Sequence, residues 1–429
     1  MFAPFQHAHL DHSHRRASRI SPVNPDDVEG SNSNTRADRD DNEAVVVGST
    51  AWHTRGSAQF DFRSDFVTTP NAAMLKAIVN TTLCDDETME DPTTNDFQEY
   101  MAGLTGHEDA LLVLSGTMGN QVALRTALAS PPYSILCDSR SHILRMEAGG
   151  AATLCGALIQ GVVPSNGHHL TLADVKKHIA LRDDIYDCPT RVISLENTLS
   201  GTVMPIRDIY EISEFARRQS PPIHMHLDGA RLWEAVEANC GGPGRLVMHA
   251  RRFDSVTLCF SKGLGAPLGS IIVGSKAFIK RARVMRKLLG GGMRQAGVIA
   301  APARAAVDQI FLGGLLRNAQ RVAKFISSQW VMKGGKLAQP TETNMVWLDL
   351  EAAGISGESF ADIMEDAGLR AFRGRLEGRI VVHYQICGEA VYALLGVFKN
   401  ILGAEDEKDL EDLGGKEEPW RGISPPVLW

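Results

Sequence analysis

Three short segments of the sequence place reactive or anion-binding residues directly after an apolar run. Lys262 follows VTLCF and lies among small residues, Asp228 follows IHMHL, and Ser115, Gly116 and Thr117 follow ALLVL. A lysine that is partly shielded from water can have a lowered pKa and form a Schiff base with a carbonyl compound. A buried acid needs a partner, and the first turn of a helix offers backbone N–H groups to an anion. Each segment also has an ordinary explanation, because Asp228 could cap a helix and Ser-Gly-Thr is a common helix start.

Taken together, the three segments match the needs of pyridoxal 5'-phosphate (PLP). The glycine-containing segment would hold the phosphate, Asp228 would keep the ring nitrogen protonated, and Lys262 would bind the aldehyde carbon. Ligands of open α/β sheets bind beyond the carboxyl ends of the strands, where all three segments are expected. The sequence therefore predicts a PLP site at one edge of a sheet.

The apolar runs that lead to these segments alternate with helical stretches along the chain. The runs that we predict as buried strands cover residues 109–115, 191–197, 223–228, 254–261 and 269–274. Stretches such as GNQVALRTALAS and IRDIYEISEFARRQ are typical of the helices between them. This alternation predicts a mostly parallel sheet with helices on both faces. The last two runs are close enough in sequence to form a hairpin.

The pattern divides the chain into a large domain, a small domain and two tails. We predict a disordered extension over residues 1–58, a PLP-binding domain over 59–310, a smaller α+β domain over 311–403, and an acidic, Pro-rich tail over 404–429. The extension is polar and aperiodic, so it buries too little apolar surface to offset its chain entropy.

The composition excludes several classes of function. The 429 residues carry a net charge of -7 without a long basic stripe, which argues against nucleic acid or anionic membranes as partners. The seven cysteines show no metal-ligand spacing and no disulfide framework, so no metal site is expected. Neither a secretory signal nor an apolar run of the roughly 20 residues that span a bilayer is evident. We expect a cytoplasmic protein.

A series of longer segments follows, in order, the motifs of a known family. They are FDFRSDFVT, DDETMEDPTTND, SGTMGNQ, SHILRMEAGGAA, SLENT, HLDGARLW, CFSKGLGAPLGS and RKLLGGGMRQAG. From roughly Gln59 to Gly403, the chain resembles the threonine aldolase and β-eliminating lyase family of fold-type I PLP enzymes. The resemblance implies an aspartate-aminotransferase-like α/β fold, with a mostly parallel seven-stranded sheet between helices and a smaller C-terminal α+β domain. It also implies an amino-acid substrate and a homodimer or homotetramer with shared active sites.

The resemblance assigns roles to individual residues. Those implied for catalysis are Lys262 as the Schiff-base lysine, Asp228 as the partner of the ring nitrogen, and His142 as the imidazole stacked on the ring. Those implied for cofactor binding are Ser115, Gly116, Thr117, His142, Glu147, Asp228, Arg231, Lys262 and Arg294. Those implied on the substrate side are Ser64, Thr88, Leu199, Arg231 and Arg379, where Ser64 and Arg379 hold the carboxylate. Lys287 and Arg294 resemble residues at a subunit boundary near the phosphate, although an exposed basic helix would also explain them.

Two positions on the substrate side differ from the family's motifs. The aldolases typically read ENTH where this chain reads ENTL, so Leu199 replaces a histidine that lies near the substrate's β-hydroxyl. A leucine has no lone pair and cannot take a proton from that hydroxyl. Thr88 and Met89 stand where the aldolases tend to have a tyrosine followed by a glycine. The matched cofactor-binding residues are all kept.

These differences favour breaking a C–H bond over breaking a C–C bond. Losing one general base typically costs about 10²–10⁴-fold in rate, but removal of the Cα proton stays open. The chain is most similar to the fungal alanine racemase subgroup, which supplies D-alanine for peptide secondary metabolites. We therefore expect a racemase of L- and D-alanine, with an L-threonine or L-allo-threonine aldolase as the alternative. A β-eliminating lyase and a silent scaffold are weaker alternatives.

In the racemase hypothesis, Lys262 removes the α-proton from one face of the substrate. The group that returns a proton on the opposite face stays open. His142, an ordered water and Thr88 are the candidates.

Overall fold

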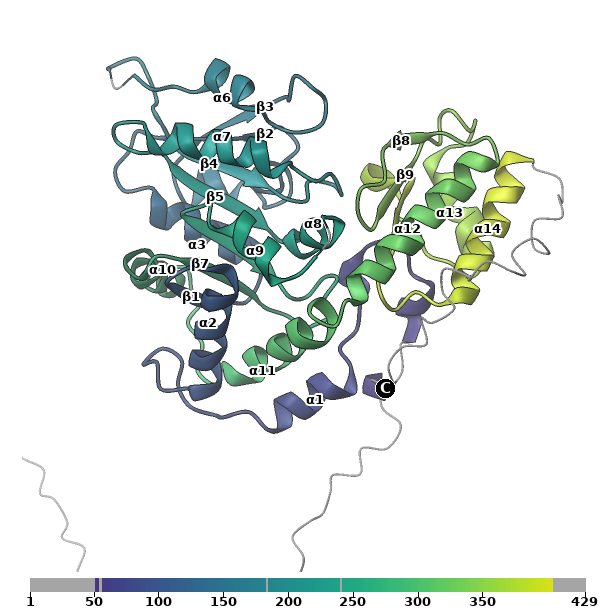
Figure 1. The fold of residues 1–429 in the computed structure, drawn as a ribbon, viewed down its shortest axis with the longest axis horizontal. Coiled ribbons are helices and arrows are strands. Elements are labelled where there is room, and N and C mark those ends of the chain that lie inside the picture. Colours follow the sequence, from purple (N-terminus) through teal and green to yellow (C-terminus); the bar gives the residue numbers. More distant parts are fainter. Residues whose placement is uncertain (1–50, 54–55, 183, 240, 404–429) are drawn as a thin grey trace, which may run out of the picture. The chain divides into compact units, whose positions relative to one another are not determined.

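The computed structural model describes residues 51–53, 56–182, 184–239 and 241–403, and its larger sheet has seven strands (Figure 1). The strand order is β1-β7-β6-β5-β4-β2-β3. The strands are β1 (Asp109–Val113), β2 (Ser134–Asp138), β3 (Leu158–Val162), β4 (Thr190–Glu196), β5 (His224–Gly229), β6 (Ser255–Cys259) and β7 (Ser270–Gly274).

All neighbouring strands of this sheet pair in parallel except where β7 is involved. β7 runs antiparallel to both β1 and β6, so β6 and β7 form the predicted hairpin. The five strands predicted from the sequence are confirmed as β1, β4, β5, β6 and β7, within a few residues at each end. The sequence prediction did not single out β2 or β3. The mostly parallel seven-stranded α/β sheet that the resemblance implies is confirmed.

Helices separate most of the strands. The α-helices up to the end of the large sheet are α1 (Ala72–Val79), α2 (Pro92–Thr105), α3 (Gly116–Ala127), α4 (His142–Arg145), α5 (Gly150–Thr153), α6 (Leu172–His178), α7 (Ile206–Arg217), α8 (Leu232–Ala238) and α9 (Pro243–Ala250). Those that follow are α10 (Lys276–Leu288), α11 (Gly297–Ala306), α12 (Leu315–Met332), α13 (Gly357–Asp366) and α14 (Gly388–Leu402). Short 3-10 helices are η1 (Ala51–His53), η2 (Gly56–Phe60), η3 (Asp65–Val67) and η5 (Gly374–Leu376), and η4 (Val307–Phe311) is a π-helix.

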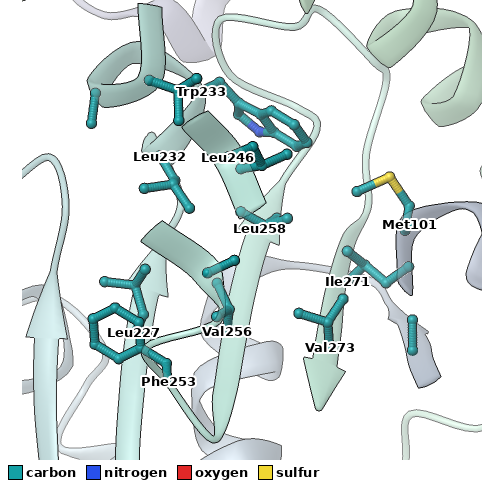
Figure 2. Close-up of a cluster of buried hydrophobic side chains, with 14 of the residues drawn as sticks. Met101, Leu227, Leu232, Trp233, Leu246, Phe253, Val256, Leu258, Ile271 and Val273 are labelled. Atoms are coloured by element: carbon teal, nitrogen blue, oxygen red, sulfur yellow. The ribbon is translucent and has the colours of Figure 1, made fainter. Parts of the chain in front are cut away.

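The two faces of the central strands differ in chemistry. Because side chains alternate along a strand, β5 turns Leu227 to one face and His226 and Asp228 to the other. Figure 2 shows the apolar face, where strand residues pack against helices α8 and α9. The labelled residues there are Met101, Leu227, Leu232, Trp233, Leu246, Phe253, Val256, Leu258, Ile271 and Val273. The apolar face anchors the strands, so the opposite face can carry polar residues toward α3.

Helix α3 lies very close to strand β6 on the polar face. A Cβ placed on Gly119 would lie 2.5 Å from Thr257 Cγ2, which no real side chain tolerates. Glycine at this position is therefore required for the approach. The close packing fixes the first turn of α3 next to the carboxyl ends of the strands.

A second sheet of three antiparallel strands follows in the sequence, in the order β10-β9-β8. Its strands are β8 (Leu337–Gln339), β9 (Met345–Leu348) and β10 (Arg379–Val381). A separate apolar cluster joins this sheet to α12, α13 and α14, with Trp330 and Phe398 in edge-to-face contact. Phe62 also belongs to this cluster, although it lies far earlier in the sequence. The predicted boundary between residues 310 and 311 falls inside η4.

The predicted tails lie mostly outside the described residues. Within the predicted disordered extension, residues 51–53 and 56–58 instead form 3-10 turns, and Ala58 is buried. Across the described part of the chain, no single helix is long and apolar enough to span a membrane. Among the described residues, one pair of consecutive helical segments is long and apolar enough when taken together. The pair is Gly297–Phe311 and Leu315–Met332, which are bent by 56° relative to each other.

Candidate active site

Four side chains, three of them buried and His142 partly exposed, form a polar group at the carboxyl ends of β4 and β5, which we call the Asp228 cluster. Its members are Asn120, His142, Glu147 and Asp228. Asn120 Nδ2 donates to Glu147 Oε1 and to Asp228 Oδ2, at 2.8 Å in each case. His142 Nδ1 lies 2.7 Å from Glu147 Oε1. The cluster thus brings together three of the residues predicted from the sequence and adds Asn120.

The charges of the Asp228 cluster are coupled to a neighbouring acid, Glu196. The hydrogen bond with Glu147 raises the pKa of His142 above its ordinary value, against the effect of burial. Glu196 is the register partner of Asp228 in the sheet, and its Oε2 accepts from the backbone N–H of His142. Burial, and then the charge of Asp228, raise the pKa of Glu196 to about 8. Burial and the nearby Asp228 carboxylate therefore both favour the neutral form of Glu196.

Lys262 lies just beyond the end of β6, where the sequence predicted it. Its backbone carbonyl accepts hydrogen bonds from Thr68 Oγ1 (2.7 Å) and from the N–H of Gly265 (2.9 Å), which fix the turn. The side chain is partly buried, and its charge acts on both Asp65 and Glu196. Lys262 is therefore within electrostatic reach of both polar groups of the site.

The predicted phosphate-binding segment is the start of α3. Ser115 is the N-cap residue, and its hydroxyl accepts from the N–H of Met118 at 3.1 Å. Gly116 and Thr117 follow as the first residues of the helix, whose first-turn N–H groups have no intrahelical partner. Such a helix start suits an anion.

A second polar group, formed by Ser64, Asp65 and Arg231, lies on the side of the small sheet. Arg231 Nε lies 2.8 Å from Asp65 Oδ2, and Arg231 Nη2 lies 2.5 Å from Asp65 Oδ1. Arg231 Nη2 also donates to Ser64 Oγ at 3.3 Å. Burial favours the neutral acid, but the charge and hydrogen bonds of Arg231 outweigh it and lower the pKa of Asp65 to about 2. Arg231, predicted to contact cofactor or substrate, is thus already paired with a carboxylate.

Arg379 begins β10 and approaches the same group. Its Nη2 donates to the carbonyl of Arg63 at 3.0 Å, and its guanidinium lies 5.0 Å from the Phe372 ring centroid. Burial and then the charge of Arg231 lower the pKa of Arg379 to about 10. Among the described residues, no group accepts from its buried Nε. An unpaired buried donor on an arginine suits a substrate carboxylate.

Leu199 follows the end of β4 and is buried, with 7% of its surface exposed. It forms an isolated bridge with Thr202. Leu199 lines a cavity of about 20 Å³ together with Glu196 and the imidazoles of His168 and His169. The residue that replaces the family's histidine therefore shares a small cavity with two other histidines.

The remaining predicted residues gather around Asp85, on an exposed surface. Thr88 is exposed and donates from its N–H to Asp85 Oδ1 at 2.9 Å. Arg294 Nη1 pairs with Asp85 Oδ2 at 2.7 Å, and Lys287 Nζ pairs with Glu87 Oε1 at 2.5 Å. These residues form a group of their own. The predicted place of Lys287 and Arg294 beside a partner's phosphate stays a prediction, as does that of Thr88 on the substrate side.

The Asp228 cluster fits PLP. The ligand atoms of His142, Glu147 and Asp228 lie within 4.8 Å of one another, which is also close enough for a metal ion. Glu147 Oε1, however, already takes bonds from Asn120 and His142, and its Oε2 takes one from Gln121 at 2.6 Å. A protonated ring nitrogen needs only Asp228, which lies on the same sheet edge as Lys262 and the start of α3. The donor set therefore favours a pyridine ring over a metal.

Comparisons with known proteins agree with this arrangement. The family model described as "Beta-eliminating lyase" matches residues 61–353. The chain belongs to this family. Members of the beta-eliminating lyase family related to threonine aldolases use PLP, and in this member Lys262, Asp228 and the first turn of α3 would hold it. PLP draws electrons away from the Cα of a bound amino acid and so weakens the bonds at that atom.

The names of related proteins indicate two kinds of activity. The chain is 52% identical over 353 residues to "Aldolase vrtJ" of Penicillium aethiopicum, covering 82% of this chain and 89% of that protein. It is 42% identical over 388 residues to "Alanine racemase TOXG" of Cochliobolus carbonum, covering 88% and 97%. It is 40% identical over 331 residues to a low specificity L-threonine aldolase of Saccharomyces cerevisiae, covering 77% and 83%.

Solved structures confirm the fold of this family member. The threonine aldolase of Leishmania major matches with a TM-score of 0.68 at 18% identity, covering 80% of this chain and 99% of that chain. A serine palmitoyltransferase of S. paucimobilis with bound PLP matches with a TM-score of 0.59 at 17% identity, covering 82% and 86%. The aspartate-aminotransferase-like fold implied by the sequence motifs is thereby confirmed.

Several residues of the site were not predicted from the sequence. Asp65 adjoins Ser64 in the motif FDFRSDFVT, and Asn120 lies within SGTMGNQ. An acid or an amide within such a motif could have been picked as a candidate site residue. Its bonding partner, however, becomes known only when the fold is known. Glu196 was noted at the end of a strand, but nothing in the sequence shows that Asp228 raises its pKa.

Proposed function

We propose that this PLP-dependent enzyme interconverts L- and D-alanine. The single observation that carries the proposal is Leu199, which stands where the family's aldolases typically have a histidine and which is buried against a small cavity. Without a base near the β-hydroxyl, retro-aldol cleavage loses its proton acceptor. Removal of the Cα proton needs no such base. The chain is related to a protein named alanine racemase, and the match covers 97% of that protein. This relationship supports the proposal.

The residues of this chain divide the work between binding and proton transfer. Arg379, with its unpaired buried Nε, binds the alanine carboxylate, and Ser64 orients it. Lys262 would take the α-proton from its own face of the substrate. Asp228, held by Asn120, would bind the ring nitrogen of the cofactor and keep it protonated. Reprotonation from the opposite face gives the other enantiomer.

A threonine or allo-threonine aldolase is the second candidate. Most of the relatives named above are aldolases, including one that is 52% identical. The structure adds a specific observation, because His168 and His169 line the same cavity as Leu199. His168 Nδ1 lies 2.7 Å from His169 Nδ1, while Glu342 and Asp208 bind the outer nitrogens of the pair. Since all four ring nitrogens are engaged, an imidazole that supplied the missing base would first have to release one of these partners.

One assay separates the two candidates. Purified protein with PLP is incubated with L-alanine or with L-threonine, and D-alanine and acetaldehyde are measured in each reaction. We expect D-alanine from L-alanine and slow or no formation of acetaldehyde. Rapid acetaldehyde formation without D-alanine would overturn the racemase proposal in favour of the aldolase. The Lys262→Ala variant, which should lose the visible absorption of the bound cofactor, is the control for enzyme-dependent turnover.

A substitution at the decisive position tests the reason for the proposal. Leu199→His restores the motif ENTH and should raise acetaldehyde formation from L-threonine by at least about 10², the lower range of a single general base. His168→Gln is the matched variant on the other side of the cavity, and it should leave this gain intact. If Leu199→His brings no gain while His168→Gln abolishes existing cleavage, His168 is the base and residue 199 does not select the bond.

A further inference from the structure

A chain of hydrogen bonds runs from Asp228 back along β5 to the first residue of that strand. Asn120 Nδ2 lies 2.8 Å from Asp228 Oδ2, and Asn120 Oδ1 lies 3.2 Å from His226 Nε2. His226 Nδ1 lies 2.9 Å from Ser255 Oγ, which lies 2.8 Å from His224 Nε2. Alternation along β5 places His224, His226 and Asp228 on one face, and Ser255 on β6 is the register partner of His226. The strand itself therefore aligns the chain.

The carboxylates at one end fix which atoms donate along this chain. Asn120 contacts both Asp228 and Glu147 through the same side-chain atom, and two carboxylates can only accept. That atom is therefore the amide nitrogen, so the amide oxygen faces His226 and must accept from His226 Nε2–H. Were the amide turned over, its oxygen would meet two carboxylates.

The remaining links follow from the neutral state of both imidazoles. Burial lowers the pKa of His226 to about 3 and that of His224 to about 4, so each ring carries one proton. Since His226 donates from Nε2, its Nδ1 accepts from the Ser255 hydroxyl. The Ser255 oxygen then accepts from His224 Nε2–H. Every link has one arrangement, in which all donors point toward Asp228.

We infer that His226 and Ser255 are positioning residues for the cofactor, because they hold the Asn120 amide in the orientation that binds Asp228. His226, Ser255 and Asn120 are almost fully buried, so water cannot replace a missing link. Without the His226 donor, the Asn120 oxygen loses its partner and the amide is free to turn. Asp228 would then lose the neutral donor that aligns its carboxylate on the ring nitrogen.

The test compares a variant that breaks the chain with one that keeps it. His226→Leu removes both ring nitrogens, whereas His226→Gln retains a donor toward Asn120 and an acceptor toward Ser255. The measurements are the visible absorption spectrum of the bound cofactor as a function of pH, the Kd for PLP, and kcat and KM. We expect His226→Leu to shift the pH midpoint of the absorption band and to weaken PLP binding and lower kcat by about 10–100-fold, with KM little changed. His226→Gln should return these values to within about 3-fold of the wild type.

A second pair of variants covers the case in which His226→Leu does not fold. Ser255→Ala breaks the next hydrogen bond, whereas Ser255→Thr keeps the hydroxyl. Only Ser255→Ala should therefore shift the pH midpoint of the absorption band. His249→Leu is the matched control. His249 is also buried, but its Nδ1 bonds to the carbonyl of Arg245 and takes no part in the hydrogen bonds that lead to Asp228. It should alter the unfolding temperature without altering the band.

Two results would overturn the inference. One is a wild-type pH midpoint and wild-type PLP affinity in a folded His226→Leu or Ser255→Ala protein. The other is an equal shift in the leucine and glutamine variants, which would indicate a purely steric role. The inference rests on PLP binding at Asp228 and not on the choice of reaction. Because the spectrum and Kd are read without substrate, its failure is distinguishable from failure of the racemase proposal.

Discussion

Two Arg–Asp ion pairs of this protein share a carboxylate pKa of about 2 but differ in burial. Asp65 is buried and Arg231 is largely shielded, with 0% and 16% of their side chains exposed, whereas Arg294 is 63% exposed in its pair with Asp85. For Asp65, the charge of Arg231 overcomes a large cost of burial. For Asp85, a hydrogen bond from Arg294 is the largest cause, with a further one from Thr88.

The comparison shows that a lowered pKa does not by itself measure how much a pair matters. A buried pair has already lost its water, so removing one partner leaves a charge without solvent. An exposed pair exchanges each partner for water and is screened by salt. The Asp65–Arg231 pair is therefore fixed in place. Arg294, by contrast, can exchange Asp85 for another anion, such as a phosphate.

The largest expected effect comes from breaking the buried pair. Arg231→Ala leaves the Asp65 carboxylate buried without its main partner and should lower the free energy of unfolding by about 3–5 kcal/mol. Urea unfolding followed by fluorescence measures this change. Arg294→Ala is the matched variant of the exposed pair and should leave the unfolding midpoint unchanged. Equal losses in the two variants would break the comparison.

A smaller effect is expected in the acid dependence of stability. The pKa of Asp65 is lowered from 3.8 to about 2 on folding, so this group stabilises the folded state above about pH 4. That contribution, about 2 kcal/mol, is lost as the pH falls through about 2. Between about pH 4 and pH 2, Asp65→Asn should therefore lose less stability than the wild type.

The exposed carboxylate sharpens this prediction. At low salt, Asp85→Asn should also reduce the acid dependence of stability, because the pKa of Asp85 is lowered as well. Raising the salt concentration to about 1 M should remove the effect of Asp85→Asn and leave most of the effect of Asp65→Asn. Parallel unfolding curves in both variants at both salt concentrations would contradict this.

The smallest expected effect on stability is that of Arg294→Ala, which should instead change the affinity for PLP. If Arg294 binds the phosphate in a partner's site, Arg294→Ala should weaken PLP binding by about 10-fold, the loss of one charge-assisted hydrogen bond. Fluorescence titration of the apoprotein with PLP measures this. The Arg304→Ala variant, which breaks an exposed i,i+4 pair with Asp308, is the control. Unchanged PLP affinity in Arg294→Ala would leave Arg294 with only a surface ion-pair role in the segment between α10 and α11.

How much could be predicted from the sequence differs between the two sides of the site. Lys262, Asp228 and the start of α3 follow apolar strands directly, so their common edge of the sheet could be predicted from local pattern. His142 begins the short helix α4 and Glu147 lies in the turn after it, and both were assigned by resemblance alone. The small sheet brings Arg379 to the carbonyl of Arg63, next to Ser64, across 316 residues, which no local pattern can indicate.

The sequence by itself determined the α/β fold class and predicted the PLP-binding residues, because strand periodicity and strand-end chemistry are local properties of the chain. Leu199 was singled out by its difference from the family's motif. Only the tertiary structure decided which of these residues touch. Burial and distance made Asn120 the bridge between two acids, paired Arg231 with Asp65, and gave Glu196 a pKa of about 8 beside Asp228. These are properties of pairs that only folding brings together, and the electrostatic energy of a pair depends on separation and solvent access, which sequence spacing does not contain.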